Sequence, residues 1–132
     1  MIETAELRFK TTEIRLAPGR AGRPPTIRGY AAIFNSLSQD LGGFVEKILP
    51  GAFREAIVAG KEVLALMHHD PKMIIGRRSV GTLTLAEDTH GLAVEIFPGN
   101  TTTGRDAIEM VRRKDIKGMS FRFNNARSTW DN

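Results

Sequence analysis

The chain has 132 residues, of which 41% are hydrophobic and 26% are charged, and its formal net charge is +4. This length and balance predict one soluble globular domain with a single hydrophobic core. The absence of cysteine excludes a disulfide framework, a zinc–thiolate site and a cysteine nucleophile. No apolar run approaches the ~20 residues that span a bilayer, and the N-terminal MIETAELRFK lacks the apolar segment of a secretory signal, so a cytoplasmic location is expected.

The first half of the chain predicts β-strands separated by turns. Three segments have strand-forming composition: 5–17, 27–35 and 44–49. Gly29 is expected to mark a bulge or a close approach of two backbones. The stretch APGRAGRPPT (17–26) predicts a mobile loop, because proline and glycine interrupt a strand. Residues 50–60, bordered by Pro50 and Gly60, predict a short helix that turns Phe53 and Ile57 inward.

The second half of the chain contains the clearest local patterns. Residues 63–70 predict a strand, and the two alternating runs within 81–97 predict a β-hairpin. Residues 101–115 predict a helix with a threonine N-cap and a basic last turn, and 117–123 predict a final strand. Because no regular helices separate these strands, the predicted fold is antiparallel and mainly β, a barrel or sandwich with short peripheral helices.

The basic residues gather in the stretches GRAGR, GRR and VRRK. Such clusters can bind phosphates or an acidic protein partner, or they can lie on a solvated surface. The chain has only one tryptophan and one tyrosine, which is too few for an aromatic platform that stacks on single-stranded bases. Nucleic acid is therefore not an expected partner.

Ser120 interrupts an apolar run in the stretch KGMSFRF (117–123). In a strand, side chains alternate between the two faces, so Ser120 is expected on the face opposite its apolar neighbours. A serine at this position is either a polar residue at a sheet edge or a nucleophile. A nucleophilic serine requires a base within hydrogen-bond reach and a third group that orients that base.

The chain has three histidines, His68, His69 and His90. His90 is expected in the turn of the hairpin, whereas His68 and His69 end a strand and should face opposite sides of it. No two histidines have metal-ligand spacing on one helix, and no metal site is predicted. The residues alone leave open which histidine, if any, is paired with a serine.

Several separated motifs, taken in order, resemble the phage prohead proteases of the HK97 type. They are GYAAIFNSLSQDLGGFVEKILPGAF, ALMHHDP, IIGR, GTLTL, GLAVEI and GMSFRF, and the resemblance spans residues 27–123. Members of this family are serine peptidases of capsid maturation, related in fold to the herpesvirus assemblins. The resemblance therefore implies an antiparallel β-barrel with short packed helices, of the herpesvirus-protease type.

The resemblance also implies roles for individual residues. Ser120 corresponds to the nucleophile, and His69 to the general base that accepts its proton and then protonates the leaving amine. Glu46 and Glu95 are the candidates for the third catalytic member, which orients the base, although a solvent-facing strand position is the favoured reading of each. Asp70 is a poorer candidate, because consecutive strand residues face opposite sides.

Arg77 is a candidate for an oxyanion or substrate contact, with a surface role as the alternative. No cofactor is implied. The sequence ends at RSTWDN (127–132), whereas family members typically continue through further strands. Residues 1–132 are therefore expected to form one prohead protease domain that lacks its last strands. Residues 1–26 are expected to be partly flexible.

The implied function is a serine endopeptidase that cleaves scaffold and capsid protein during maturation of the phage head. Its expected partners are the major capsid protein, its scaffolding segment and further copies of itself, through autoprocessing and a homo-oligomer. The expected location is the immature procapsid in the cytoplasm of the bacterial host. The alternative is an inactive, truncated barrel that serves as a capsid-assembly binding module or survives as a prophage remnant, and Ser120→Ala separates the two.

Overall fold

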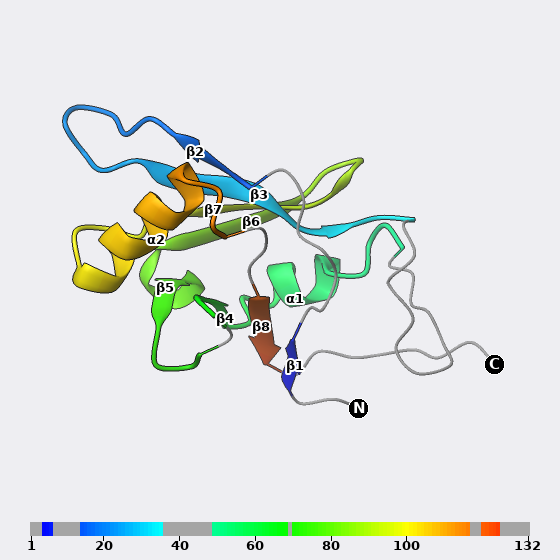
Figure 1. Cartoon of the computed structure of the whole chain (residues 1–132). Coiled ribbons are helices and arrows are strands. Elements are labelled where there is room, and N and C mark those ends of the chain that lie inside the picture. Colours follow the sequence, from blue (N-terminus) through cyan, green and yellow to red (C-terminus); the bar gives the residue numbers. More distant parts are fainter. Residues whose placement is uncertain (1–3, 7–13, 36–48, 69, 117–119, 125–132) are drawn as a thin grey trace.

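The structure is a computed structural model that describes residues 4–6, 14–35, 49–68, 70–116 and 120–124 (Figure 1). These residues form the following elements: β1 (Thr4–Glu6), β2 (Arg15–Ala17), β3 (Thr26–Ile33), α1 (Arg54–Val58), β4 (Val63–Leu66), β5 (Ile74–Arg77), the 3-10 helix η1 (Arg78–Val80), β6 (Leu83–Glu87), β7 (Gly91–Ile96), α2 (Thr102–Arg112) and β8 (Ser120–Asn124).

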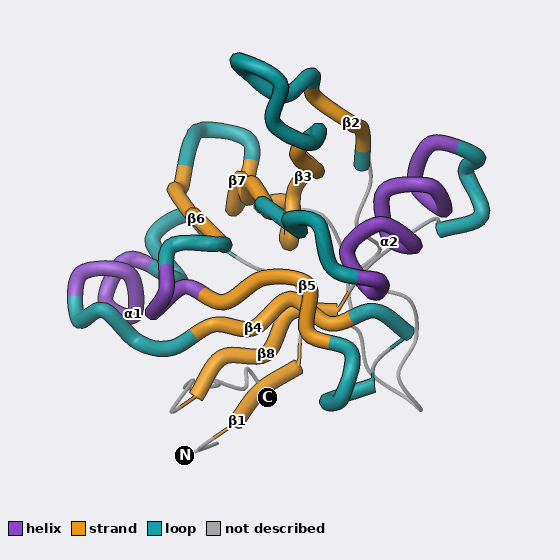
Figure 2. Tube along the Cα trace, turned by 90° about the vertical axis from the view of Figure 1, so that its left-hand side faces the viewer, coloured by secondary structure: helices purple, strands orange, loops and turns teal. Residues whose placement is uncertain are grey.

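Within the described part of the chain, the strands form two four-stranded sheets in which every pairing is antiparallel. The first sheet has the order β1-β8-β4-β5 and the second has the order β2-β3-β7-β6. Figure 2 shows one sheet above the other, with α1 and α2 on opposite sides of the pair. The short helix η1 carries the chain from β5 in the first sheet to β6 in the second.

The predicted mainly β, antiparallel architecture with short helices is confirmed. Within the described ranges, no strand of one sheet pairs with a strand of the other, so a closed barrel is not detected and the herpesvirus-type barrel is not confirmed. The strand predicted at 44–49 falls almost entirely outside the described residues. Part of the 1–26 segment is ordered into β1 and β2, and the expected flexibility of this segment stays a prediction.

The hydrophobic core lies between the two sheets. Ile27, Leu92 and Ile96 of the second sheet and Val63 of the first are at most 1% exposed. The alternation in the predicted hairpin explains this arrangement, since Leu83 pairs with Ile96 and both side chains turn inward. The hairpin predicted at 81–97 is therefore confirmed as β6 and β7.

The helix predicted at 101–115 is confirmed as α2. The Thr101 side chain accepts a hydrogen bond of 2.9 Å from the backbone N–H of Gly104, as an N-cap does. The buried face contains Gly104, Ala107, Ile108 and Val111, and the helix contacts β2 and β3 of one sheet and β5 of the other. It thereby closes one side of the core. Among the described residues, no helix has the length and apolar character needed to cross a membrane.

Helix α1 is held at both ends by side chains from distant elements. The carboxylate of Glu87 on β6 accepts the backbone N–H groups of Gly51 (3.1 Å) and Phe53 (2.8 Å). At the other end, the guanidinium of Arg78 donates to three carbonyls, the shortest bond being 2.7 Å to Ile57. A helix of five residues is too short to be stable alone, and these two charges complement its dipole. The predicted helix at 50–60 is thus confirmed, with anchors that lie outside it.

The bulge predicted at Gly29 lies slightly further along β3. Gly29 pairs regularly with Val94, and the register shifts between Tyr30 and Ala32 instead. The close approach of two backbones is made by Gly91, where a Cβ atom would lie only 2.0 Å from the Ala32 carbonyl oxygen. The strand β5 was not among the predicted strands, because its four residues are too few to show a period.

We expect Glu87→Ala to lower the free energy of unfolding by about 1–3 kcal/mol, because two backbone N–H groups at the start of α1 lose a charged acceptor. Urea denaturation measures this change. Glu55→Ala is the matched control, since Glu55 lies on α1 and has no side-chain partner among the described residues. Equal losses in the two variants would show that Glu87 does not anchor the helix.

Candidate active site

Strand pairing places Ser120 at one end of β4. Ser120 is the first residue of β8 and pairs with Leu66, the last residue of β4. From Leu66 the chain continues through Met67 and His68 to His69, which lies outside the described residues. The start of β8 therefore lies beside the strand end that leads to the predicted base. Glu46, the other predicted carboxylate, also lies outside the described residues.

The loop that joins β4 to β5 is closed by local hydrogen bonds. The N–H of Met67 donates to the Met73 carbonyl (3.0 Å), and the N–H of Met73 donates to the Asp70 carbonyl (2.9 Å). The Asp70 carboxylate accepts the N–H of Lys72 at 2.9 Å, so it stabilises the turn itself. His68 is exposed and has a φ of 56°, a left-handed conformation that histidine tolerates better than most residues.

Glu95 lies in the second sheet, on β7, whereas Ser120 lies in the first. Its carboxylate accepts hydrogen bonds of 2.8 Å from the Thr26 hydroxyl and from Nε of Arg28. Burial acts to raise the pKa of Glu95, but these two hydrogen bonds and the charges of Arg28 and Arg20 outweigh it and lower the pKa. Glu95 thus joins β3 to β7, and strand pairing does not bring it to Ser120.

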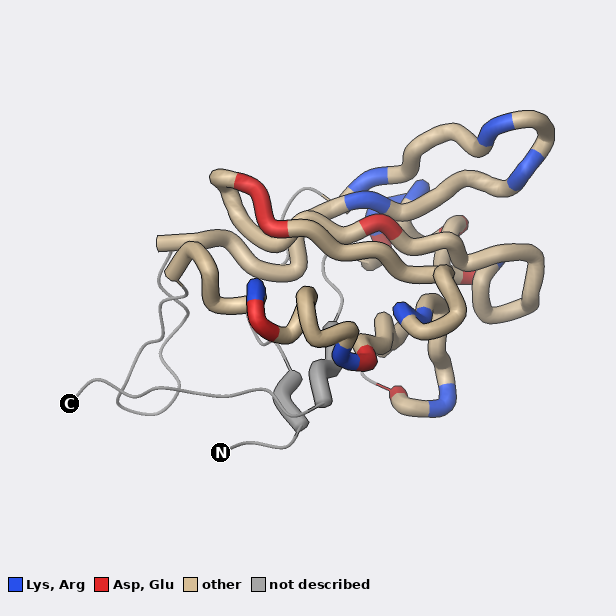
Figure 3. The backbone as a smooth tube through the Cα atoms, turned by 180° about the vertical axis from the view of Figure 1, so that it is seen from behind, with Lys and Arg blue, Asp and Glu red and all other residues tan. Residues whose placement is uncertain are grey.

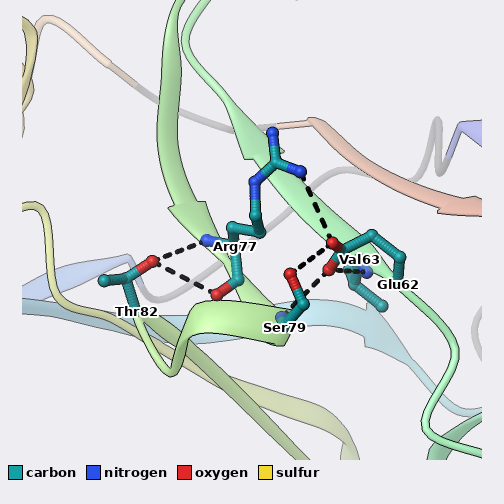
Figure 4. Close-up of polar contacts among 5 residues, drawn as sticks. All are labelled: Glu62, Val63, Arg77, Ser79 and Thr82. Atoms are coloured by element: carbon teal, nitrogen blue, oxygen red, sulfur yellow. Dashed lines mark hydrogen bonds and ion pairs between the residues drawn. The ribbon is translucent and has the colours of Figure 1, made fainter.

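Arg77 lies at the end of β5, opposite Leu64 of β4. Leu64 also pairs with Arg122 of β8, so these three residues form one row across the first sheet. The Arg77 backbone N–H donates to the Thr82 hydroxyl at 2.8 Å, and its guanidinium lies 3.5 Å from the Glu62 carboxylate (Figure 4). The side chain of Arg77 remains 41% exposed, so it can contact both Glu62 and a further group.

Glu62 is the centre of a polar cluster that the sequence did not reveal (Figure 4). Its carboxylate accepts the Ser79 hydroxyl (2.6 Å), the Ser79 N–H (3.0 Å) and the Val63 N–H (3.1 Å). Burial acts to raise the pKa of Glu62, but the bonds from Ser79 and Val63 and the charge of Arg77 lower it overall. The cluster fixes η1 to the start of β4.

No group of three or more histidine or acidic residues among the described ranges is placed to hold a metal ion.

We expect the stabilisation that Glu62 provides to be pH-dependent. Because hydrogen bonding lowers the pKa of Glu62 in the folded chain, its contribution is complete above the ordinary glutamate value of 4.5 and is lost as the pH falls through the lower folded value. Glu62→Gln should therefore reduce the free energy of unfolding by about 1–3 kcal/mol at neutral pH, and the difference from the original chain should shrink in acid.

Urea denaturation of the two chains across a pH series measures this difference. Glu55→Gln controls for the loss of one negative charge on an exposed helix. If the free energies of unfolding of the Glu62→Gln and original chains differ by the same amount down to the most acidic pH, the lowered pKa of Glu62 is contradicted.

Comparison with known protein families finds a match. A family model described as caudovirus prohead serine protease matches residues 10–132, which is nearly the whole chain. No curated protein and no solved structure matches the chain. The chain belongs to the caudovirus prohead serine protease family.

Proposed function

We propose that this chain is a serine endopeptidase that cleaves scaffold and capsid protein, and itself, during maturation of the phage head. Family membership supports the enzyme class. The observation that carries the residue assignment is the pairing of Ser120 with Leu66 at the end of β4. The proposed partners are the major capsid protein, its scaffolding segment and further copies of this chain, and the proposed location is the immature procapsid in the host cytoplasm.

In the proposed reaction, the Ser120 hydroxyl attacks the scissile carbonyl while His69 accepts its proton. His69 then donates that proton to the leaving amine. Chain connectivity makes this pair feasible, because three peptide units keep the Cα atom of His69 within about 11 Å of that of Leu66. Directly paired residues of antiparallel strands are only about 5 Å apart, so Ser120 lies beside the end of β4 from which the chain continues to His69.

For the third catalytic member, the carboxylate that orients His69, we propose Glu46. The carboxylate of Glu95 is already bonded to Thr26 and Arg28 in the other sheet, which supports a structural role for it. The Asp70 carboxylate is likewise engaged by the N–H of Lys72. Arg77 is proposed as a substrate contact, since Glu62 orients its guanidinium while leaving it partly exposed. A closed barrel of the herpesvirus-protease type stays part of this proposal.

A serine-directed fluorophosphonate tests the Ser–His assignment. We expect mass spectrometry to find one adduct, on Ser120, and none after Ser120→Ala. His69→Ala should slow labelling roughly a hundredfold or more, because the serine loses its base. His68→Ala is the matched control and should keep most of the labelling, because this neighbouring histidine has no proposed role in the chemistry.

Circular dichroism on each variant confirms that the chain is folded. A folded original chain that forms no adduct would contradict the proposed function and favour the inactive binding module. An adduct that persists on the Ser120→Ala chain would assign the nucleophile to another serine.

The third member is tested by comparing Glu46→Gln with Glu95→Gln. We expect Glu46→Gln to slow labelling by about tenfold or more, because the base loses the group that orients it. Glu95→Gln should leave the labelling rate nearly unchanged but lower the free energy of unfolding by about 1–3 kcal/mol, because two bonds to a carboxylate are weakened. Slow labelling of folded Glu95→Gln with normal labelling of Glu46→Gln would reverse the assignment.

A further inference from the structure

The excess positive charge of the described residues is concentrated on the β2–β3 hairpin, defined as residues 14–35. This hairpin has no acidic residue and four arginines: Arg15, Arg20, Arg23 and Arg28. The other described residues contain ten basic and ten acidic side chains, so the hairpin accounts for the whole excess. Figure 3 shows basic positions along this projecting hairpin.

The four arginines form two pairs of like charge. Arg15 and Arg28 are directly opposite each other in the β2–β3 pairing. Arg20 and Arg23 are the first and last residues of a turn that is closed by a 3.0 Å hydrogen bond from the Arg23 N–H to the Arg20 carbonyl. Like charges at facing positions destabilise a hairpin. Glu95 forms an ion pair with Arg28 alone, and the other three arginines form none among the described residues.

The backbone at the tip of the hairpin forms a defined tight turn. Ala21 and Gly22 both have positive φ, 51° and 76°, as in the tight turns that suit hairpins. A Cβ atom on Gly19 would lie 1.9 Å from the Arg23 carbonyl oxygen, which shows how closely the two sides approach. Two prolines, at 24–25, further restrict the returning side. Such a pre-organised surface loses little conformational entropy on binding.

We propose that the β2–β3 hairpin is a docking surface for an acidic, extended polypeptide segment. Exposed arginines without carboxylate partners are complementary to a run of glutamate or aspartate. Within the described residues β2 is the edge strand of its sheet, so an extended chain can lie along it. The part of the hairpin that carries the arginines, 14–29, has no aromatic side chain on which bases could stack. Of the two aromatic residues that follow, Tyr30 packs against His90 and Phe34 is buried, which favours a polypeptide over a nucleic acid.

This surface is separate from the candidate active site. The hairpin belongs to the second sheet and Ser120 to the first, and Figure 1 shows the hairpin projecting beyond α2, away from β8. Binding at the hairpin therefore does not depend on the proposed protease activity. It can be measured with a chain that carries Ser120→Ala, in which no cleavage complicates the result.

The test is fluorescence anisotropy with a labelled peptide of alternating glutamate and alanine, added to the full chain carrying Ser120→Ala. We expect binding that weakens as salt increases. The further changes Arg20→Gln and Arg23→Gln should weaken it about tenfold, which corresponds to about 1.4 kcal/mol. The matched control, Arg54→Gln with Arg105→Gln, removes two positive charges elsewhere and should retain the affinity. A Gly-Ser peptide should not bind.

Two results would overturn the proposal. One is absence of binding, or an equal loss in both double variants, which would show that the hairpin has no special role. The other is tighter binding of a single-stranded oligonucleotide of equal charge than of the peptide, which would assign the surface to nucleic acid. Thermal unfolding of each variant excludes loss of the fold as the cause of any loss of binding.

Discussion

The arrangement of the two sheets depends on the short connection that carries the chain from one to the other. Helix η1 provides this connection, and two charged side chains hold it. Glu62, which precedes β4, accepts both the hydroxyl and the N–H of Ser79 in η1. Arg78, also in η1, donates to the carbonyls at the end of α1. The first sheet, the second sheet and α1 are thus joined through three consecutive residues, and the charges are stabilised because each has several partners.

The same connection is linked to the candidate active site by strand β4. Glu62 fixes the start of this strand, and its last residue, Leu66, pairs with Ser120. A strand of four residues has little freedom to shift once one end is anchored, because a slip by one residue would move the buried Val63 and Ala65 to the opposite face of the sheet. The polar cluster at one end of β4 therefore supports the register that positions Ser120 at the other.

Local patterns in the sequence were sufficient to predict the elements whose hydrophobic period lies entirely within the element. The alternation of 81–97 and the helical period of 101–115 each lie within one element, and both predictions are confirmed. The partners of Glu62 and Glu87 lie in other elements, so nothing near these residues in the sequence marks their roles. Family membership followed from several motifs in order and is confirmed. The roles of Ser120 and His69 stay predictions, because they depend on side-chain geometry outside the described residues.

The anchoring of α1 has a consequence for the order of folding. Its two anchors, Arg78 and Glu87, follow it in the chain, and Glu87 lies over thirty residues beyond the N–H groups that it binds. During synthesis, α1 therefore emerges from the ribosome before either anchor does. Because five residues cannot sustain a helix alone, we infer that α1 becomes ordered only after η1 and β6 have packed. The segment would then gain protection against amide hydrogen exchange later than η1 and β6 as the nascent chain folds.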